Sequence, residues 1–212
     1  MTTLLTRAEL APLADEPTFL LRMFDVIEDA LVNDHGSELG VASWLRYPVG
    51  AGERLANVIL VSSPRHGTTL RTWSPRSRSD VLVQCLDAET GGPEVVLQGP
   101  PVAFWRTSAP VAVAARHLAP PGARTLGIIG SGTEARLHVL AMRAALPDLE
   151  VVHAWSPTAA HREAFARKMG EATGLRVEAT ENGEDAVRGA DIVSLAAFSP
   201  APPITSELVR PG

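Results

Sequence analysis

Six consecutive residues have the types and spacing that bind the phosphates of a dinucleotide. Gly130-Ser131-Gly132-Thr133-Glu134-Ala135 fits the pattern G-x-G-x-x-G/A and follows the apolar run 125–129. In this pattern the first glycine permits a tight turn off a strand, and the second lets the backbone approach a pyrophosphate. Ala135 is small enough for close helix–sheet packing, and a helix start offers free N–H groups to phosphates. The alternative is a glycine turn in an unrelated α/β fold.

The residues after the next apolar run bear on which dinucleotide binds. An Asp or Glu at this place holds the ribose hydroxyls of NAD, whereas a cationic or hydroxyl-rich site accepts the 2′-phosphate of NADP. Residues 154–158 contain no carboxylate but include Ser156 and Thr158, and Arg162 follows one turn later. This set favours NADP(H) over NAD(H). The alternative is that Ser156 only caps the following helix and that Arg162 is solvated.

Several stretches, in order along the chain, resemble the ornithine cyclodeaminase and mu-crystallin family. They are residues 5–10, the turn 86–91, the Arg-Thr helix 106–118, the glycine loop 130–135, and residues 189–193 and 202–204. The resemblance implies a substrate-binding and dimerisation domain with a mostly antiparallel sheet, which we expect over residues 1–119. It also implies an NAD(P)-binding Rossmann domain, which we expect over residues 120–212. A homodimer through the N-terminal domain is the implied assembly.

The resemblance also implies which arginines bind the substrate. Arg106 matches the family arginine that holds the substrate carboxylate, and a planar guanidinium suits this role because it binds carboxylates bidentately. The alternative for Arg106 is an ion pair at a helix start. The adjacent Thr107 falls on the family's cofactor side. A second family arginine corresponds to Arg46 or to Arg54, and both stay open.

The chain departs from the family pattern at two places. The family has a lysine near the substrate carboxylate and the reacting carbon, but this chain has no lysine before Lys168, which is its only one. We expect Arg71 at that position, where it can bind a carboxylate but cannot readily exchange a proton. The family also has an aspartate after a further strand, whereas this sequence ends at Gly212. We therefore expect an incomplete Rossmann domain, from a truncated product or a fragment.

Three functions stay open on these grounds. The favoured one is an NAD(P)-dependent imine reductase or amino-acid dehydrogenase that acts on a small α-imino or α-amino acid. It is favoured because reduction of a preformed imine asks less of the protein than cyclisation, since the cofactor performs the difficult step. The second is an ornithine or lysine cyclodeaminase that releases ammonia. The third is a non-catalytic protein that binds NADPH or a small ligand in the manner of mu-crystallin, or an inactive remnant.

Helices and strands must position these candidate residues. The hydrophobic pattern predicts an antiparallel, strand-rich region followed by a region in which strands and helices alternate. Strand-like runs 81–86 and 94–98 flank the turn-forming residues 87–93, which predicts an antiparallel hairpin. Helices are expected after Pro17 and over about 105–118, with Pro110 in the first turn of the second. After Gly122 the strands 125–129, 151–154, 176–179 and 191–195 alternate with helices. That alternation predicts an α/β fold with a parallel, doubly wound sheet.

The composition limits the classes of partner that we expect for the chain. With 24 acidic and 19 basic residues, a net charge of −5 and 45% hydrophobic residues, the chain is neither disordered nor basic enough to favour nucleic acid. No run approaches the ~20 apolar residues of a membrane span. A lone Cys85 and no visible secretory signal fit the cytoplasm, and no metal-ligand spacing is present. The expected partner is a small amino- or imino-acid substrate.

Overall fold

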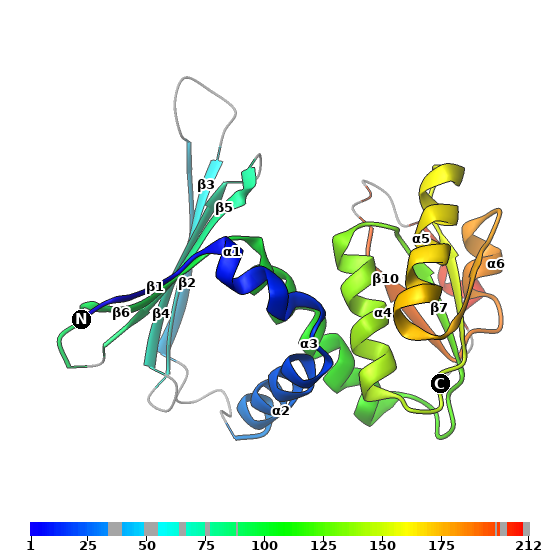
Figure 1. Ribbon diagram of the computed structural model, residues 1–212, viewed down its shortest axis with the longest axis horizontal. Helices are drawn as coiled ribbons and strands as arrows, with labels where there is room; N and C mark the ends of the chain where they lie inside the picture. The colour runs from blue at the N-terminus through cyan, green and yellow to red at the C-terminus, as the bar shows by residue number, and fades with distance from the viewer. Residues whose placement is uncertain are drawn as a thin grey trace. The chain divides into compact units, whose positions relative to one another are not determined.

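A computed structural model describes most of the chain. The described backbone covers residues 1–33, 40–48, 55–63, 67–74, 77–87, 89–197, 199 and 203–209, and some side chains within these ranges also lie outside the description. The chain divides into two compact units (Figure 1). Unit 1 contains Met1–Phe19 and Asp25–Arg106, and unit 2 contains Leu20–Phe24 and Thr107–Gly212.

Unit 1 is built on a six-stranded sheet. Its strands are β1 (Thr3–Leu5), β2 (Gly40–Pro48), β3 (Leu55–Ser63), β4 (Gly67–Ser74), β5 (Ser77–Leu86) and β6 (Pro93–Gln98). They lie in the order β1-β6-β5-β4-β3-β2, and every pair is antiparallel except β1 with β6. The predicted mostly antiparallel sheet is therefore confirmed.

The β5–β6 hairpin forms at the predicted turn. The Asp87 carboxylate accepts hydrogen bonds from the backbone N–H of Glu89 at 3.1 Å and of Thr90 at 2.7 Å. The Thr90 hydroxyl donates a third, and these bonds hold the pKa of Asp87 below its usual value. Gly91 takes a positive φ of 68°, which glycine tolerates without a Cβ clash. The local turn residues thus fix the register that the hairpin needs.

The two faces of the unit 1 sheet differ in burial. The register places Arg71 on the same face as Asn57 and Val81, and both of these are almost fully buried. Because side chains alternate along a strand, the residues between them point to the other face. That face carries four leucines that are 37–60% exposed, namely Leu4, Leu45, Leu60 and Leu82. Unit 1 therefore leaves one apolar sheet face uncovered.

The helices between β1 and β2 begin at a proline or a cap. The α1 helix (Arg7–Leu10) starts with a capping box between Thr6 and Glu9, and η1 (Ala11–Asp15) follows. The α2 helix (Pro17–Asn33) begins at the predicted proline. The sequence pattern predicts no helix before it, because a four-residue helix is too short to show a hydrophobic period.

The α3 helix (Pro100–Leu118) corrects one boundary. It starts five residues earlier than expected, and Pro110 lies inside it rather than in its first turn. The proline pair at its start has the fixed φ that a first helical turn accepts. Pro110 has no N–H to donate to the carbonyl of Arg106, so one helical hydrogen bond cannot form there. The division between the two units falls at the same place, between Arg106 and Thr107.

Unit 2 is a parallel α/β unit. Its strands β7 (Thr125–Ile129), β8 (Val151–Trp155), β9 (Arg176–Ala179) and β10 (Ile192–Leu195) lie in the order β10-β7-β8-β9, all parallel. Between them run α4 (Thr133–Ala145), α5 (Ala159–Thr173) and α6 (Gly183–Val187), and η2 (Ser206–Leu208) follows (Figure 1). The predicted alternation is confirmed.

The central strand β7 is buried on both sides. Leu126 and Ile128 pack into the core formed with α4 and α5, whereas Ile129 packs with α6. Gly127 lies on the α6 side, where an added Cβ would overlap the carbonyl oxygen of Ala186. This close approach of helix and strand depends on glycine at position 127.

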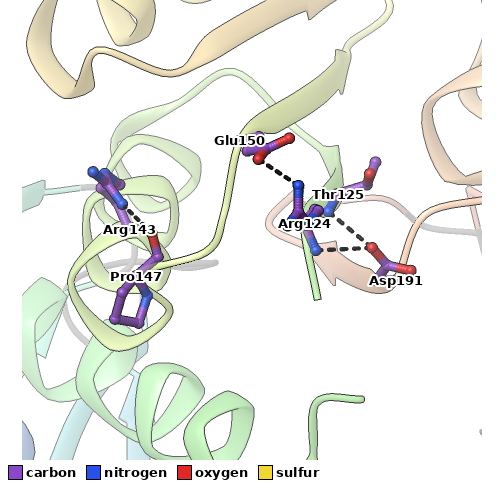
Figure 2. Close-up of polar contacts among 6 residues, drawn as sticks. All are labelled: Arg124, Thr125, Arg143, Pro147, Glu150 and Asp191. Atoms are coloured by element: carbon purple, nitrogen blue, oxygen red, sulfur yellow. Dashed lines mark hydrogen bonds and ion pairs between the residues drawn. The ribbon is translucent and has the colours of Figure 1, made fainter. Parts of the chain in front are cut away.

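Polar contacts tie the strands together at the edge of the sheet where they begin (Figure 2). The Asp191 carboxylate accepts hydrogen bonds from the backbone N–H groups of Arg124 at 2.9 Å and Thr125 at 3.0 Å. The Arg124 guanidinium contacts Glu150 at 2.7 Å, and Arg143 donates to the carbonyl of Pro147 at 2.9 Å. These contacts leave the opposite edge, where the strands end, for the glycine loop. Within the described ranges, no helix has the length and apolarity to cross a membrane.

Candidate functional site

The glycine loop turns sharply off β7. Gly130 has a φ of 131°, and its N–H donates to the carbonyl of Trp155 at the end of β8 at 2.7 Å. An added Cβ at Gly130 would lie 2.5 Å from the carbonyl oxygen of Ala196. Only glycine fits both the conformation and the contact. The predicted role of Gly130 in the turn agrees with this geometry.

Gly132 stands in front of open space. It is the N-cap of α4, and an added Cβ there would meet nothing within 4 Å. The first hydrogen bond of the helix runs from the N–H of Arg136 to the carbonyl of Gly132, so the helix itself leaves the preceding N–H groups unused. These groups include those of Thr133 and Glu134. Open space before unused donors and a positive helix end fits the pyrophosphate of a dinucleotide.

Ala135 packs as the fingerprint requires. Its side chain is fully buried in the core between α4, α5 and the sheet. Small size at this position allows the helix to lie close to β7. Gly130, Gly132 and Ala135 therefore have the conformation, the open space and the small buried side chain that the pattern predicts, and the binding of a dinucleotide stays a prediction.

The end of β8 brings together hydroxyls and one guanidinium. Ser131 of the loop donates to the hydroxyl of Ser156 at 2.9 Å, and Ser156 is almost fully buried. Arg162 donates to the backbone carbonyl of Ser156 at 3.2 Å. The N-cap of α5 is Thr158, with an exposed side chain, and not Ser156. The alternative in which Ser156 caps α5 is therefore wrong, and Arg162 is half-buried with one bond to the backbone.

A groove of about 490 Å³ runs between α4 and α5 beside the loop. Its lining residues are Ser131, Gly132, Thr133, Arg136, His161, Ala164, Phe165, Lys168 and Met169. Sequence reasoning did not assign Arg136, His161 or Lys168 to a site. The spacing of His161, Ala164, Phe165 and Lys168 along one stripe of α5 is the signal that could have found it.

Glu134 and His138 lie on another side of α4. His138 is buried and its Nδ1 is 2.9 Å from the hydroxyl of Ser194 on β10. Its Nε2 is also buried and has no hydrogen-bond partner within the described part of the chain. Burial lowers the pKa of His138, and the nearby Glu134 carboxylate opposes that shift. Glu134, predicted as a cofactor-binding residue of the glycine motif, lies in the first turn of α4 and acts electrostatically on a buried imidazole.

Two of the predicted substrate arginines influence each other in unit 1. Arg71 is half-buried on β4, and Arg106 is exposed on α3. Burial, and then the positive charge of Arg106, lower the pKa of Arg71 to about 10. Arg71 therefore stays charged at neutral pH. Two cationic groups close enough to repel each other can share an anionic ligand, because the ligand's charge relieves that repulsion.

The remaining predicted residues are less defined. The backbone of Arg46 pairs with Asn57 in the sheet, but its side chain lies outside the described residues, as does all of Arg54. Thr107 is half-buried on α3. Trp105 is buried, and its ring centroid is 4.6 Å from that of Phe19, so it packs inside unit 1.

A family comparison covers most of the chain. The model described as "Ornithine cyclodeaminase/mu-crystallin family" matches residues 66–212. That range contains the hairpin, α3 and all of the β7–β10 sheet, and it is well over half of the chain.

Individual relatives agree with this match. The chain is 33% identical over 131 residues to a Δ1-pyrroline-2-carboxylate reductase of Bacillus cereus, covering 62% of this chain and 40% of that protein. It is 28% identical over 204 residues to the ketimine reductase mu-crystallin of Macropus fuliginosus, covering 90% of this chain and 63% of that protein. The chain thus spans less than two thirds of these relatives.

A solved structure shares the fold. The Δ1-pyrroline-2-carboxylate reductase of Thermococcus litoralis, in complex with NADH and L-proline, superposes with a TM-score of 0.82 at 20% identity. The superposition covers 99% of this chain and 66% of that one. At this identity the likeness establishes the architecture, which matches the expected pair of an antiparallel and a parallel sheet.

Proposed function

The chain belongs to the ornithine cyclodeaminase/mu-crystallin family, and we propose that it transfers hydride between NADP(H) and a small α-imino or α-amino acid. The observation that carries this proposal is the glycine loop, where Gly132 faces open space at the start of α4. When bound, the nicotinamide supplies or accepts the hydride, so the protein's tasks are to bind and to orient. The relatives that reduce pyrroline-2-carboxylate and ketimines support this class of substrate.

In this proposal, unit 1 binds the carboxylate of the substrate. Arg106 supplies a planar, exposed guanidinium, and Arg71 supplies a second positive charge from the buried side of the sheet. Charge-assisted bonds of this kind fix a carboxylate in orientation as well as in place. With a pKa of about 10, Arg71 holds its proton at neutral pH and acts as a cation.

The permanent charge of Arg71 favours imine reduction over cyclodeamination. Cyclodeamination needs oxidation to an imine, attack by a distal amine, loss of ammonia and return of the hydride. Each amine step moves protons, and a guanidinium is a poor group for that work. Reduction of a preformed imine needs only one hydride and one proton.

NADP(H) is proposed over NAD(H) because of the end of β8. Ser131, Ser156 and Arg162 form a connected polar group there, and residues 154–158 carry no carboxylate. A carboxylate at this place would bind the free ribose hydroxyls of NAD and repel a 2′-phosphate.

We also propose a homodimer through the uncovered face of the unit 1 sheet. The four leucines on that face are 37–60% exposed, and soluble proteins rarely leave such faces open. A Leu60→Glu variant is expected to shift the chain to monomer in analytical ultracentrifugation, whereas Glu89→Gln in the exposed hairpin turn leaves the mass unchanged. An unchanged mass for both variants would contradict this assembly.

A cytoplasmic location completes the proposal. Cys85 is the only cysteine, and burial raises the pKa of its thiol, which keeps the thiol protonated. A single cysteine cannot form an internal disulfide, which suits a reducing compartment. Fractionation of cells that express the chain is expected to recover it in the cytosol, and recovery outside the cytosol would contradict this.

An activity assay discriminates among the candidate functions. The chain is mixed with NADPH or NADH and Δ1-pyrroline-2-carboxylate, and loss of the reduced nicotinamide absorbance is followed. In parallel, L-ornithine with the oxidised cofactor is tested for release of ammonia. Imine-dependent oxidation of NADPH supports the proposal, and ammonia release without it supports a cyclodeaminase. Cofactor binding with neither reaction supports a non-catalytic binding role.

A further inference from the structure

Two buried polar contacts of unit 2 lie on either side of the glycine loop. Ser131 donates to the hydroxyl of Ser156 at 2.9 Å, and Nδ1 of His138 on α4 is 2.9 Å from the hydroxyl of Ser194 on β10. Ser156, His138 and Ser194 are each only 5–6% exposed. The Ser131–Ser156 contact belongs to the proposed NADP(H) site, whereas the proposed function makes no use of His138 and Ser194.

The Ser194 hydroxyl orients the buried ring of His138. Nε2 of the same ring is also buried and has no hydrogen-bond partner among the described residues, so the contact through Nδ1 is what fixes the ring. A hydrogen bond has a preferred length and angle, whereas a purely apolar contact tolerates small displacements. This pair therefore fixes the position of α4 against β10 more narrowly than apolar packing alone would.

Contacts beyond Ser194 lead back to the glycine loop. Two residues later, the N–H of Ala196 donates to the carbonyl of Ile129 at 2.8 Å. The carbonyl oxygen of Ala196 lies against Gly130, where an added Cβ would be only 2.5 Å away. From Gly130 the chain passes through the loop into α4 and reaches His138 in the second helical turn. The loop and the start of α4 are thus closed into a ring by the His138–Ser194 bond and the Gly130–Ala196 contact.

This ring determines where the unused N–H groups at the start of α4 point. A pyrophosphate at a helix N-terminus accepts hydrogen bonds from several such groups at once. Hydrogen bonds weaken steeply with distance and angle, so a small shift of α4 against β10 weakens all of them together. His138 needs no contact with the ligand to have this effect, because it acts through the backbone.

We propose that His138 is a positioning residue for dinucleotide binding, which holds the phosphate-binding end of α4 in place through its hydrogen bond to Ser194. This inference rests on the proposed use of a nicotinamide dinucleotide. Since the pyrophosphate is common to NADPH and NADH, loss of the His138–Ser194 bond weakens both cofactors by the same factor. A change at the end of β8, where the 2′-phosphate is proposed to bind, would instead alter the preference between them.

The test removes the bond from either side and then restores it. His138→Leu replaces the ring with an apolar side chain of similar volume, and Ser194→Ala removes the hydroxyl. His138→Asn keeps a polar atom near the place of Nδ1, so it can bond to Ser194 again. Dissociation constants for NADPH and NADH are measured by calorimetry.

We expect His138→Leu and Ser194→Ala each to weaken both cofactors about tenfold, the effect typical of one lost hydrogen bond. We expect His138→Asn to recover most of that loss. The double variant His138→Leu/Ser194→Ala is expected to bind about as weakly as either single variant, because all three lack the same bond.

Val139→Ala is the matched control for a merely structural effect. Val139 follows His138 on α4 and is fully buried in the core of unit 2. Its truncation leaves a cavity, so we expect a larger fall in the thermal midpoint than for His138→Leu, with both cofactor affinities unchanged. Affinities that followed the thermal midpoint across all the variants would overturn the proposal, as would unchanged affinities in both His138→Leu and Ser194→Ala.

Hydrogen exchange in the cofactor-free chain tests the ring separately from the proposed function. The N–H of Arg136 donates to the carbonyl of Gly132 at 3.0 Å, and that of Ala196 is bonded across the sheet. We expect exchange of both amide protons to be several-fold faster in His138→Leu than in Val139→Ala.

The two measurements keep the failures apart. If the unchanged chain binds neither cofactor, the proposed function fails, and the positioning role fails with it even where the exchange pattern supports the ring. If both cofactors bind but exchange at Arg136 and Ala196 is the same in His138→Leu and Val139→Ala, the positioning role fails and the proposed function stands.

Discussion

The proposed dinucleotide site of unit 2 is made by backbone, whereas the proposed carboxylate site of unit 1 is made by side chains. Gly130 and Gly132 act through the absence of a Cβ, one where backbone crowds it and one before open space. Arg71 and Arg106 act through charge, one half-buried and one exposed. A backbone site is broken by adding atoms, and a side-chain site by removing them. We therefore expect substitutions of the glycines to act by adding atoms where backbone or ligand lies close, and substitutions of the arginines to act by removing a charge.

The largest effect is expected at Gly127, where backbone packing is tightest. Gly127→Ala places a Cβ against the carbonyl of Ala186, so β7 and α6 must separate. We expect the free energy of unfolding to fall by about 3 kcal/mol. Urea denaturation followed by circular dichroism measures it.

Gly170→Ala is the matched control for this change. Gly170 lies in α5, and an added Cβ there makes only ordinary contact, 3.5 Å from the carbonyl oxygen of Leu175. We expect no loss of stability and a gain of up to about 1 kcal/mol. Equal losses for both variants would contradict the packing argument.

The next largest effect is expected at Arg106, in the site of unit 1 that is made by side chains. Arg106→Gln removes a charged, bidentate donor from the proposed carboxylate site. We expect kcat/KM for the imine to fall about 30-fold, which corresponds to about 2 kcal/mol, while affinity for NADPH is unchanged. Steady-state kinetics and cofactor titration measure the two quantities.

Arg106→Lys keeps the charge but loses the planar fork, so we expect it to recover only part of that loss. A full recovery would show that charge alone suffices. A loss of NADPH affinity in either variant would argue against a substrate role for Arg106.

A smaller effect is expected where a Cβ meets no protein atom. Gly132→Ala has space in the structure, and its φ of −86° is open to alanine. We expect the stability to change by less than about 1 kcal/mol, because alanine is only a poorer N-cap than glycine. Affinity for both cofactors is expected to fall about tenfold, because the methyl group occupies the place of the pyrophosphate. Unchanged affinity would place the phosphates elsewhere.

The smallest effect concerns the buried imidazole of His138. Burial holds its pKa below the ordinary value of 6.5, so the folded chain keeps it neutral after the unfolded chain has bound a proton. Its contribution to stability is thus complete above pH 6.5 and is lost as the pH falls below that value. We expect His138→Gln to reduce the pH dependence of the unfolding free energy below pH 6.5. The reduction is smaller than about 1.4 kcal/mol per pH unit, the value for one whole proton. Denaturation at several pH values measures it, and an identical slope would contradict the assignment.

The sequence predicted unit 2 more fully than unit 1 for a physical reason. The roles of Gly130, Gly132 and Ala135 depend on six consecutive residues between a strand and a helix, and this local pattern is readable. Two other contacts join residues more than 50 positions apart, namely that of Gly127 with α6 and that of His138 with Ser194. No local sequence pattern predicts them.

In unit 1 the mostly antiparallel sheet and the β5–β6 hairpin were predicted, since turn residues and alternation are local signals. The start of α3 was not, because the sequence pattern favours Pro110 in a first helical turn, whereas Pro100 already begins the helix. The proximity of Arg71 to Arg106 depends on how a strand and a helix pack. Only the family resemblance, and not the spacing of these residues, suggested that they act together.

Transfer of deuterium from the cofactor tests the central claim most directly. NADPH labelled with deuterium at the transferable position of the nicotinamide is incubated with the chain and Δ1-pyrroline-2-carboxylate, and the product is examined by mass spectrometry and NMR. We predict proline that carries one deuterium at its Cα, formed together with NADP⁺. Oxidised cofactor without deuterated proline, or no oxidation despite bound NADPH, would contradict the account.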